Sequence, residues 1–130
     1  MKYYNLLFVT AFVASLLVGC EVSNDTVMKI SREKGSAEAL SIARQNGCMN
    51  CHNVTNSIVG PAWDLVSERY KDSPDARAYL INKVKKGGGG AWSDITGGAK
   101  MPPHESRVSH AHIAQIVDFI ISLKADSAAK

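Results

Sequence analysis

Apolar residues recur at steps of three and four positions in the C-terminal part of the chain. Between positions 109 and 123 they are Ile113, Ile116, Val117, Ile120 and Leu123. This spacing places them on one face of an α-helix, as expected of a helix that packs against a core. The same reasoning predicts shorter helices over 36–46, 61–70 and 72–84, and no stretch alternates in the manner of a strand. The pattern therefore predicts an all-α fold with four or so helices.

Local signals place the ends of these helices. Ser36 is a suitable N-cap, Gly47 follows the first helix, and Pro74 suits the first turn of the third. In the three shorter helices, the apolar positions expected to face the core of the domain are Ala39, Leu40, Ile42, Ala43, Leu65, Val66, Tyr70, Tyr79, Leu80, Ile81 and Val84. Together with the C-terminal stripe they predict one small core.

The first twenty residues follow a different pattern. Lys2 precedes an apolar run over 6–18, which is shorter than the roughly 20 residues that a membrane-spanning helix needs. A cation followed by a short apolar run is typical of a secretory signal peptide. The run ends in Leu-Val-Gly-Cys, which resembles the lipobox of bacterial lipoproteins, in which the cysteine is lipidated. We expect a signal peptide over 1–19 and lipidation of Cys20; the alternative is an ordinary cleaved signal with a chance cysteine beside the cut.

The segment after Cys20 is polar, carries charges of both signs and lacks aromatic residues as far as position 35. We interpret 20–35 as a flexible tether and 36–130 as one domain by length. A domain of this size has a modest core, so a large bound group would help it to fold. The net charge of +3 comes with no basic run interleaved with aromatic residues, and nucleic-acid binding is therefore unsupported.

The strongest chemical signal is Cys-Met-Asn-Cys-His at positions 48–52. This spacing lets the thiols of Cys48 and Cys51 point the same way and add to two vinyl groups of a haem, while His52 lies beneath the same porphyrin. The motif is that of covalent c-type haem attachment. A thioredoxin-like redox pair would need a βαβ context, and a structural zinc site would need four ligands in suitably spaced positions; neither is visible.

A long segment rich in glycine and proline separates the third and fourth predicted helices. Loops of this length without secondary structure are usually functional or disordered, and this one holds Trp92 and Met101. Met101 is the candidate sixth ligand of the iron, because the two prolines after it restrict the backbone and a thioether favours reduced iron. Met49 lies within the haem-binding turn, and Met28 lies in the predicted tether.

Residues 36–124 contain these motifs in an order that resembles the class I c-type cytochromes of the short bacterial periplasmic monohaem kind. The shared segments, in order, are 47–52, 59–62, 86–92, 101–103 and 117–123. The resemblance implies a cytochrome c fold around one haem c, attached through Cys48 and Cys51, with His52 and Met101 as iron ligands.

The resemblance also implies roles for other residues. The carbonyl of Pro61 would accept the Nδ1–H of His52. The ring of Trp92 would cover a haem edge and donate its indole N–H to a propionate. Trp63, Leu80 and Ile81 are expected in the core or the wall of the haem pocket, and none of them is expected to be a ligand.

The chain departs from the shortest family members between Trp92 and Met101. The additional residues 94–98 are expected to bulge near the haem propionates, which leaves the exposure of that edge open. His104 and Lys100 are candidates to replace Met101 as a ligand, but we expect both on the surface.

Five cations flank this loop, namely Lys83, Lys85, Lys86, Lys100 and Arg107. They form either a weak positive ring that steers acidic partners or an ordinary solvated face.

The predicted function is one-electron transfer in respiration, with no catalysis and no small-molecule substrate. The partners would be membrane oxidoreductases and terminal oxidases or reductases. The protein would meet them on the periplasmic side of the cell envelope, where the lipid on Cys20 would anchor it to the membrane. The alternatives are a haem enzyme or gas sensor, which would use Arg107 or His104 on the distal side, and a fixed subunit of a larger complex. Met–iron absorbance in the far red would favour the carrier, and tight carbon monoxide binding would favour the enzyme or sensor.

Overall fold

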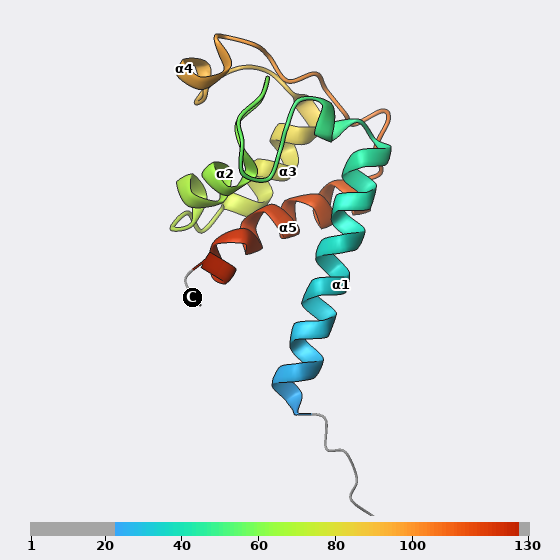
Figure 1. Cartoon of the computed structure of the whole chain (residues 1–130). Coiled ribbons are helices and arrows are strands. Elements are labelled where there is room, and N and C mark those ends of the chain that lie inside the picture. Colours follow the sequence, from blue (N-terminus) through green and yellow to red (C-terminus); the bar gives the residue numbers. More distant parts are fainter. Residues whose placement is uncertain (1–22, 128–130) are drawn as a thin grey trace, which may run out of the picture. The chain divides into compact units, whose positions relative to one another are not determined.

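The computed structural model describes residues 23–127, with side chains as far as Leu123. The signal peptide predicted over 1–19 and the lipidation site Cys20 lie outside the described residues. The helices are α1 Asn24–Gln45, the 3-10 helix η1 Cys48–Asn50, α2 Trp63–Tyr70, α3 Ala76–Lys86, α4 Ser93–Thr96 and α5 His110–Ser127 (Figure 1). No strand occurs in this part of the chain apart from one isolated bridge, so the all-α prediction is confirmed.

The chain divides into two units, Met1–Ser31 and Arg32–Lys130. Residues 24–35, predicted as part of a flexible tether, are helical instead. The helix begins at a cap in which Ser23 Oγ accepts a hydrogen bond from the backbone N–H of Thr26 at 3.3 Å, and Asp25 in the first turn favours the helix dipole. The segment contains no proline and several good helix formers. Its side chains are exposed, as expected of a segment outside the core.

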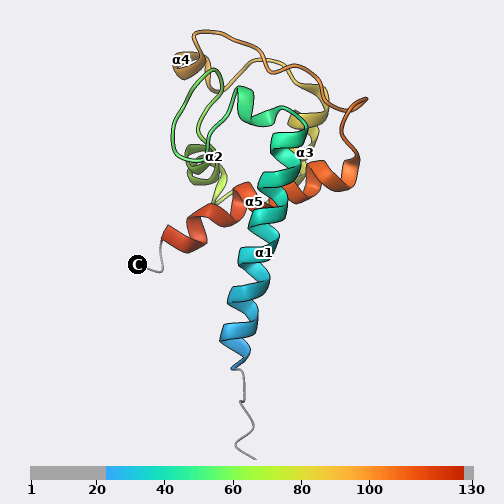
Figure 2. The same cartoon turned by 45° about the vertical axis from the view of Figure 1, so that its right-hand side comes forward.

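The core of the second unit lies where α5 packs against α2 and α3. Four positions of the predicted stripe on α5 are buried: Ile113 and Val117 are fully enclosed, while Ile116 and Ile120 are nearly so. The fifth, Leu123, is half-buried. Burial of an aliphatic side chain of this kind contributes roughly 1.5–3 kcal/mol, so this stripe is a main source of stability. Figures 1 and 2 both show α5 crossing beside α2 and α3.

Two predicted core positions are exposed. Leu65 on α2 and Tyr79 on α3 are 42% and 48% exposed, so their assignment to the core is wrong. The eight-residue α2 buries Trp63, Val66 and Ser67, which recur at the three- and four-residue spacing of a single helix face. Leu65 lies about 100° around the helix from Val66 and cannot share that face.

A long segment joins α3 to α5 within the second unit. It leaves α3, includes the short helix α4, and returns to α5 along the side that faces the 48–60 segment (Figures 1 and 2). Within the described part of the chain, no helix is long and apolar enough to cross a membrane.

Candidate functional site

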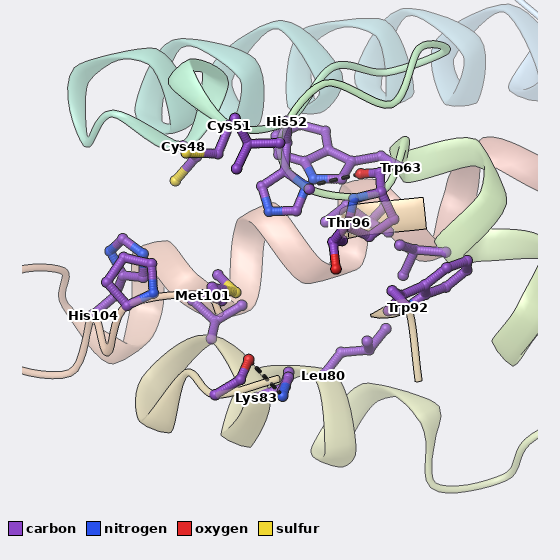
Figure 3. A pocket seen from close by; sticks show the side chains of 18 of the residues that line it. Cys48, Cys51, His52, Trp63, Leu80, Lys83, Trp92, Thr96, Met101 and His104 are labelled. Atoms are coloured by element: carbon purple, nitrogen blue, oxygen red, sulfur yellow. Dashed lines mark hydrogen bonds between the residues drawn. The ribbon is translucent and has the colours of Figure 1, made fainter. Parts of the chain in front are cut away.

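A cavity of about 330 Å³ lies in the second unit, between the 46–63 segment, α3, α5 and the long loop. It is lined by every predicted site residue that the structure describes, namely Cys48, Cys51, His52, Pro61, Trp92 and Met101. Figure 3 shows most of these side chains around one space. Ligand pockets in proteins have volumes of roughly 300–1,000 Å³, so the cavity is of binding-site size.

The two thiols are held by a tight turn. The backbone N–H groups of Cys51 and His52 both donate to the carbonyl of Cys48, at 3.3 and 3.0 Å. Both cysteines are half-buried free thiols on the same side of the cavity (Figure 3). Burial raises the pKa of the Cys48 thiol, and the nearby Arg107 guanidinium partly opposes this effect. The turn thus presents two thiols to one ligand.

The imidazole of His52 is fixed in orientation and tautomer. Its Nδ1 lies 2.8 Å from the carbonyl oxygen of Pro61, the contact that the resemblance implies. A carbonyl oxygen only accepts, so Nδ1 carries the hydrogen and Nε2 keeps its lone pair for a metal. The ring stacks on Trp63 at a centroid distance of 6.1 Å. A side chain at Gly60 would overlap the His52 ring, so glycine is needed at this close approach.

Met101 is held by the backbone on the other side of the cavity. Its N–H donates to the carbonyl of Gly88 at 3.2 Å, and the N–H of Gly88 donates to the carbonyl of Met101 at 2.8 Å. Gly87 packs directly against the Met101 carbonyl oxygen and the following proline. In Figure 3 the Met101 side chain and the His52 ring come from opposite walls toward the same space.

The structure overturns one prediction about the loop, because His104 is buried rather than on the surface. It is 7% exposed and lines the cavity. Its backbone N–H donates to the carbonyls of Val84 and Lys85, at 3.2 and 3.1 Å, which draws the chain onto the end of α3. Its Nδ1 lies 3.2 Å from Nη2 of Arg107, which only donates, so Nδ1 is the acceptor. Burial, followed by the charges of Arg107 and His52, lowers the pKa of His104.

Trp92 forms part of the cavity wall and is half-buried. The guanidinium carbon of Arg69 lies 4.8 Å from the centroid of its ring, within the range of a cation–π contact. Part of the inserted segment 94–98 is helical, since α4 covers Ser93–Thr96, and Thr96 at its end lines the cavity. Sequence reasoning missed Arg69 and Thr96, because no motif marks either residue.

The predicted ring of cations is partly engaged within the chain. The ammonium of Lys83 donates to the carbonyls of Gly88 and Gly89 at 3.1 and 2.6 Å. Lys85 forms an ion pair with Glu105 at 2.7 Å. The ion pair offsets the charge of Lys85, whereas Lys83 keeps its charge and is held in place by the backbone carbonyls.

The alternative uses of the two cysteines find no support in the described residues. They contain no group of three or more His, Cys, Asp or Glu side chains that would hold a metal ion. The strands that a thioredoxin-like pair requires are also missing from residues 23–127.

Comparison with known proteins identifies the family. The sequence pattern of the cytochrome c family matches residues 36–124. The chain is 41% identical over 83 residues to cytochrome c-552 of Hydrogenobacter thermophilus, covering 64% of this chain and 79% of that protein. It is 38% identical over 91 residues to cytochrome c-552 of Nitrosomonas europaea, covering 69% and 84%. The crystal structure of Nitrosomonas europaea cytochrome c552 has a TM-score of 0.58 and 37% identity, covering 65% of this chain and 98% of that one.

The cavity residues fit a covalently bound haem. Two thiols stand on one wall, and an imidazole nitrogen and a thioether are presented from opposite sides, which is a donor set suited to iron. The glycine at position 60 leaves the His52 ring in place, and the remaining walls are largely apolar. The chain therefore belongs to the cytochrome c family, and it is a monohaem electron carrier rather than an enzyme, with one haem c bound covalently through Cys48 and Cys51.

Proposed function

We propose that His52 and Met101 are the two axial ligands of the haem iron, and that the protein passes single electrons between membrane or periplasmic redox enzymes of a respiratory chain. The observation that carries the proposal is the approach of these two side chains from opposite walls of one cavity (Figure 3). The haem supplies the one-electron redox change when it is bound, and the protein positions its ligands.

Both proposed ligands are supported by backbone contacts that need not change with oxidation state. The Pro61 carbonyl keeps the proton of His52 on Nδ1 and makes the imidazole a better donor through Nε2. The bridge to Gly88 holds the Met101 backbone from both its N–H and its carbonyl. A thioether ligand stabilises reduced iron relative to a second histidine, which suits a carrier with a raised reduction potential.

Trp92 has a supporting role in this proposal. Its half-buried ring lies in the cavity wall across from the thiols, where its indole N–H would donate to a haem propionate. A buried indole N–H seeks such a partner, because leaving a polar hydrogen unpaired is costly.

We also propose a location on the periplasmic side of the cell envelope. The signal-like segment 1–19 would be removed, Cys20 would carry the lipid, and 36–130 would form the cytochrome domain. The support is the sequence pattern of the first twenty residues. Labelling with a fatty-acid analogue tests it: the full chain should take up label, and Cys20→Ser should not. Equal labelling of both would contradict the lipid anchor.

The axial ligands are tested with Met101→Ala and the matched control Met28→Ala, which removes a methionine that is 67% exposed. Each full-length chain is produced in a bacterium that matures c-type cytochromes, and haem attachment is checked by mass spectrometry. The unmodified protein and Met28→Ala should show the far-red Met–iron band when oxidised, whereas Met101→Ala should keep its covalent haem and lose the band. Retention of the band in Met101→Ala, or tight carbon monoxide binding by the reduced unmodified protein, would refute the proposal.

A further inference from the structure

The inserted segment after Trp92 is an ordered part of the cavity wall. The backbone N–H groups of Ile95 and Thr96 donate to the Trp92 carbonyl at 3.0 and 2.8 Å. The N–H of Ala99 then donates to the Thr96 carbonyl at 3.1 Å, which closes the turn. Helix α4 is therefore tied to Trp92 and positions its own side chains relative to that ring.

Thr96 is the member of α4 that faces the cavity. Ser93, Asp94 and Ile95 are exposed, whereas Thr96 is half-buried and belongs to the cavity lining. Figure 3 shows its hydroxyl directed into the space that the labelled side chains surround. Its oxygen lies 3.5 Å from the Ala99 carbonyl, which is longer than an ordinary O–H···O hydrogen bond of roughly 2.5–3.0 Å. The hydroxyl hydrogen thus remains suited to a closer acceptor.

The two thiols determine which chemical group of a haem lies near Thr96. A haem carries its two vinyl groups on adjacent pyrroles and its two propionates on the other pair. Attachment through Cys48 and Cys51 therefore turns the carboxylates toward the opposite wall of the cavity. In Figure 3, Thr96 and Trp92 stand on the side away from Cys48. A hydroxyl donor at this position matches a carboxylate acceptor.

We infer that Thr96 is a haem-positioning residue supplied by the inserted helix α4, and that its hydroxyl donates a hydrogen bond to a haem propionate beside Trp92. This inference rests on the proposed haem site. The donor favours the ionised carboxylate and disperses its negative charge. Oxidised iron is then less stabilised by that charge, so the hydroxyl raises the reduction potential.

Several charged or titratable groups from other elements also lie around this region. Arg69 of α2 lies over the Trp92 ring. The charged or titratable side chains that line the cavity, besides the cysteines and His52, are Tyr70, Tyr79, Lys83, Lys100, His104 and Arg107. Their contributions are common to all variants of α4. The experiment therefore compares substitutions within α4 alone.

The test uses the full haem-loaded protein with Thr96→Val, which removes the hydroxyl at nearly constant shape. Thr96→Ser keeps the hydroxyl, and Ser93→Ala removes an exposed hydroxyl from the same helix. The reduction potential is measured over a range of pH by spectroelectrochemistry. In Thr96→Val the proton affinity of the carboxylate should rise about tenfold, which moves the pH-dependent step up by about one pKa unit. The potential above that step should fall, while Thr96→Ser and Ser93→Ala should follow the unmodified protein.

An unchanged pH profile in Thr96→Val, with its far-red Met–iron band intact, would overturn the inference. Thr96→Ala removes the same hydroxyl with a smaller side chain, and an unchanged profile there counts equally against it. Failure of the proposed axial ligands is distinguishable, since it would remove the far-red band from the unmodified protein as well.

Discussion

Replacement of Gly87 by alanine should damage the Met101 side of the site more than any nearby glycine substitution. Gly87 follows α3 with φ 67° and ψ −146°, a backbone conformation that is essentially restricted to glycine. A Cβ atom built on it would overlap the carbonyl oxygen of Met101 and lie 2.7 Å from the carbonyl carbon of Pro102. These neighbours are backbone atoms and cannot rotate away.

Two costs add in Gly87→Ala. Holding a non-glycine residue in this backbone region costs about 1–3 kcal/mol. Forcing a methyl group into an occupied space costs roughly another 1–3 kcal/mol. The free energy of unfolding should therefore fall by about 2–6 kcal/mol, out of a total near 5–15 kcal/mol for a domain of this kind. One kcal/mol lowers the melting temperature of a small domain by roughly 4–8 °C, so a loss of about 10 °C or more is expected.

Gly97→Ala is the matched control. Gly97 has φ 58° and ψ 27°, and nothing lies within 4 Å of its Cβ position, so its cost is the left-handed conformation alone, about 1–2 kcal/mol. Thermal unfolding is followed by circular dichroism, and the proposed ligation by Met101 is followed by the far-red band. Gly87→Ala should unfold at lower temperature and lose the band first. Equal stability of the two variants, with the band retained in both, would refute the reasoning.

Three further predictions concern the core, His52 and His104. Ile113→Ala should lower the free energy of unfolding by about 2–5 kcal/mol in chemical denaturation, because Ile113 is fully buried, whereas Ile58→Ala at a side chain 57% exposed should change it by under about 0.5 kcal/mol; similar losses would contradict the assigned core. Gly60→Ala should displace the His52 ring and abolish the low-spin visible spectrum despite retained covalent haem, and an unaltered spectrum would show that the ring has room. Because the pKa of His104 is lowered in the folded protein, the unfolded chain protonates this imidazole first as the pH falls. The stabilisation by neutral His104 is therefore complete above about pH 6.5. It is lost as the pH falls from there through the folded pKa. The melting temperature of His104→Asn should therefore vary less between neutral and mildly acidic pH than that of the unmodified protein, and an equal variation would exclude His104 as its source.

The residues with a strong local or motif signal behaved as the sequence predicts. The apolar stripe of α5 is buried because its spacing is a property of the helix itself. The turn after Gly47 presents both thiols on one side because their separation is short enough for local hydrogen bonds to determine it. The contact between His52 and Pro61 was expected from the resemblance and is present.

The errors arose where the environment of a residue depends on distant segments. Leu65 has the hydrophobicity of a core residue, but the core contacts only one face of α2. The helix over 24–35 was missed because its side chains are polar, although good helix formers and a capping serine suffice to form it. Thr96 carries no motif, and its place in the cavity follows from the hydrogen bonds of α4 to Trp92.

The amino-acid sequence by itself determined the helical class, the attachment motif and the candidate ligand at position 101, because periodicity and short spacings act over a few residues. Tertiary structure alone decided that Met101 comes to face His52 and that His104 is enclosed beside Arg107. These arrangements bring together residues far apart in the chain or fold a loop back onto α3. They depend on the packing of α5 against α2 and α3 and on backbone hydrogen bonds across the loop, which no local pattern encodes.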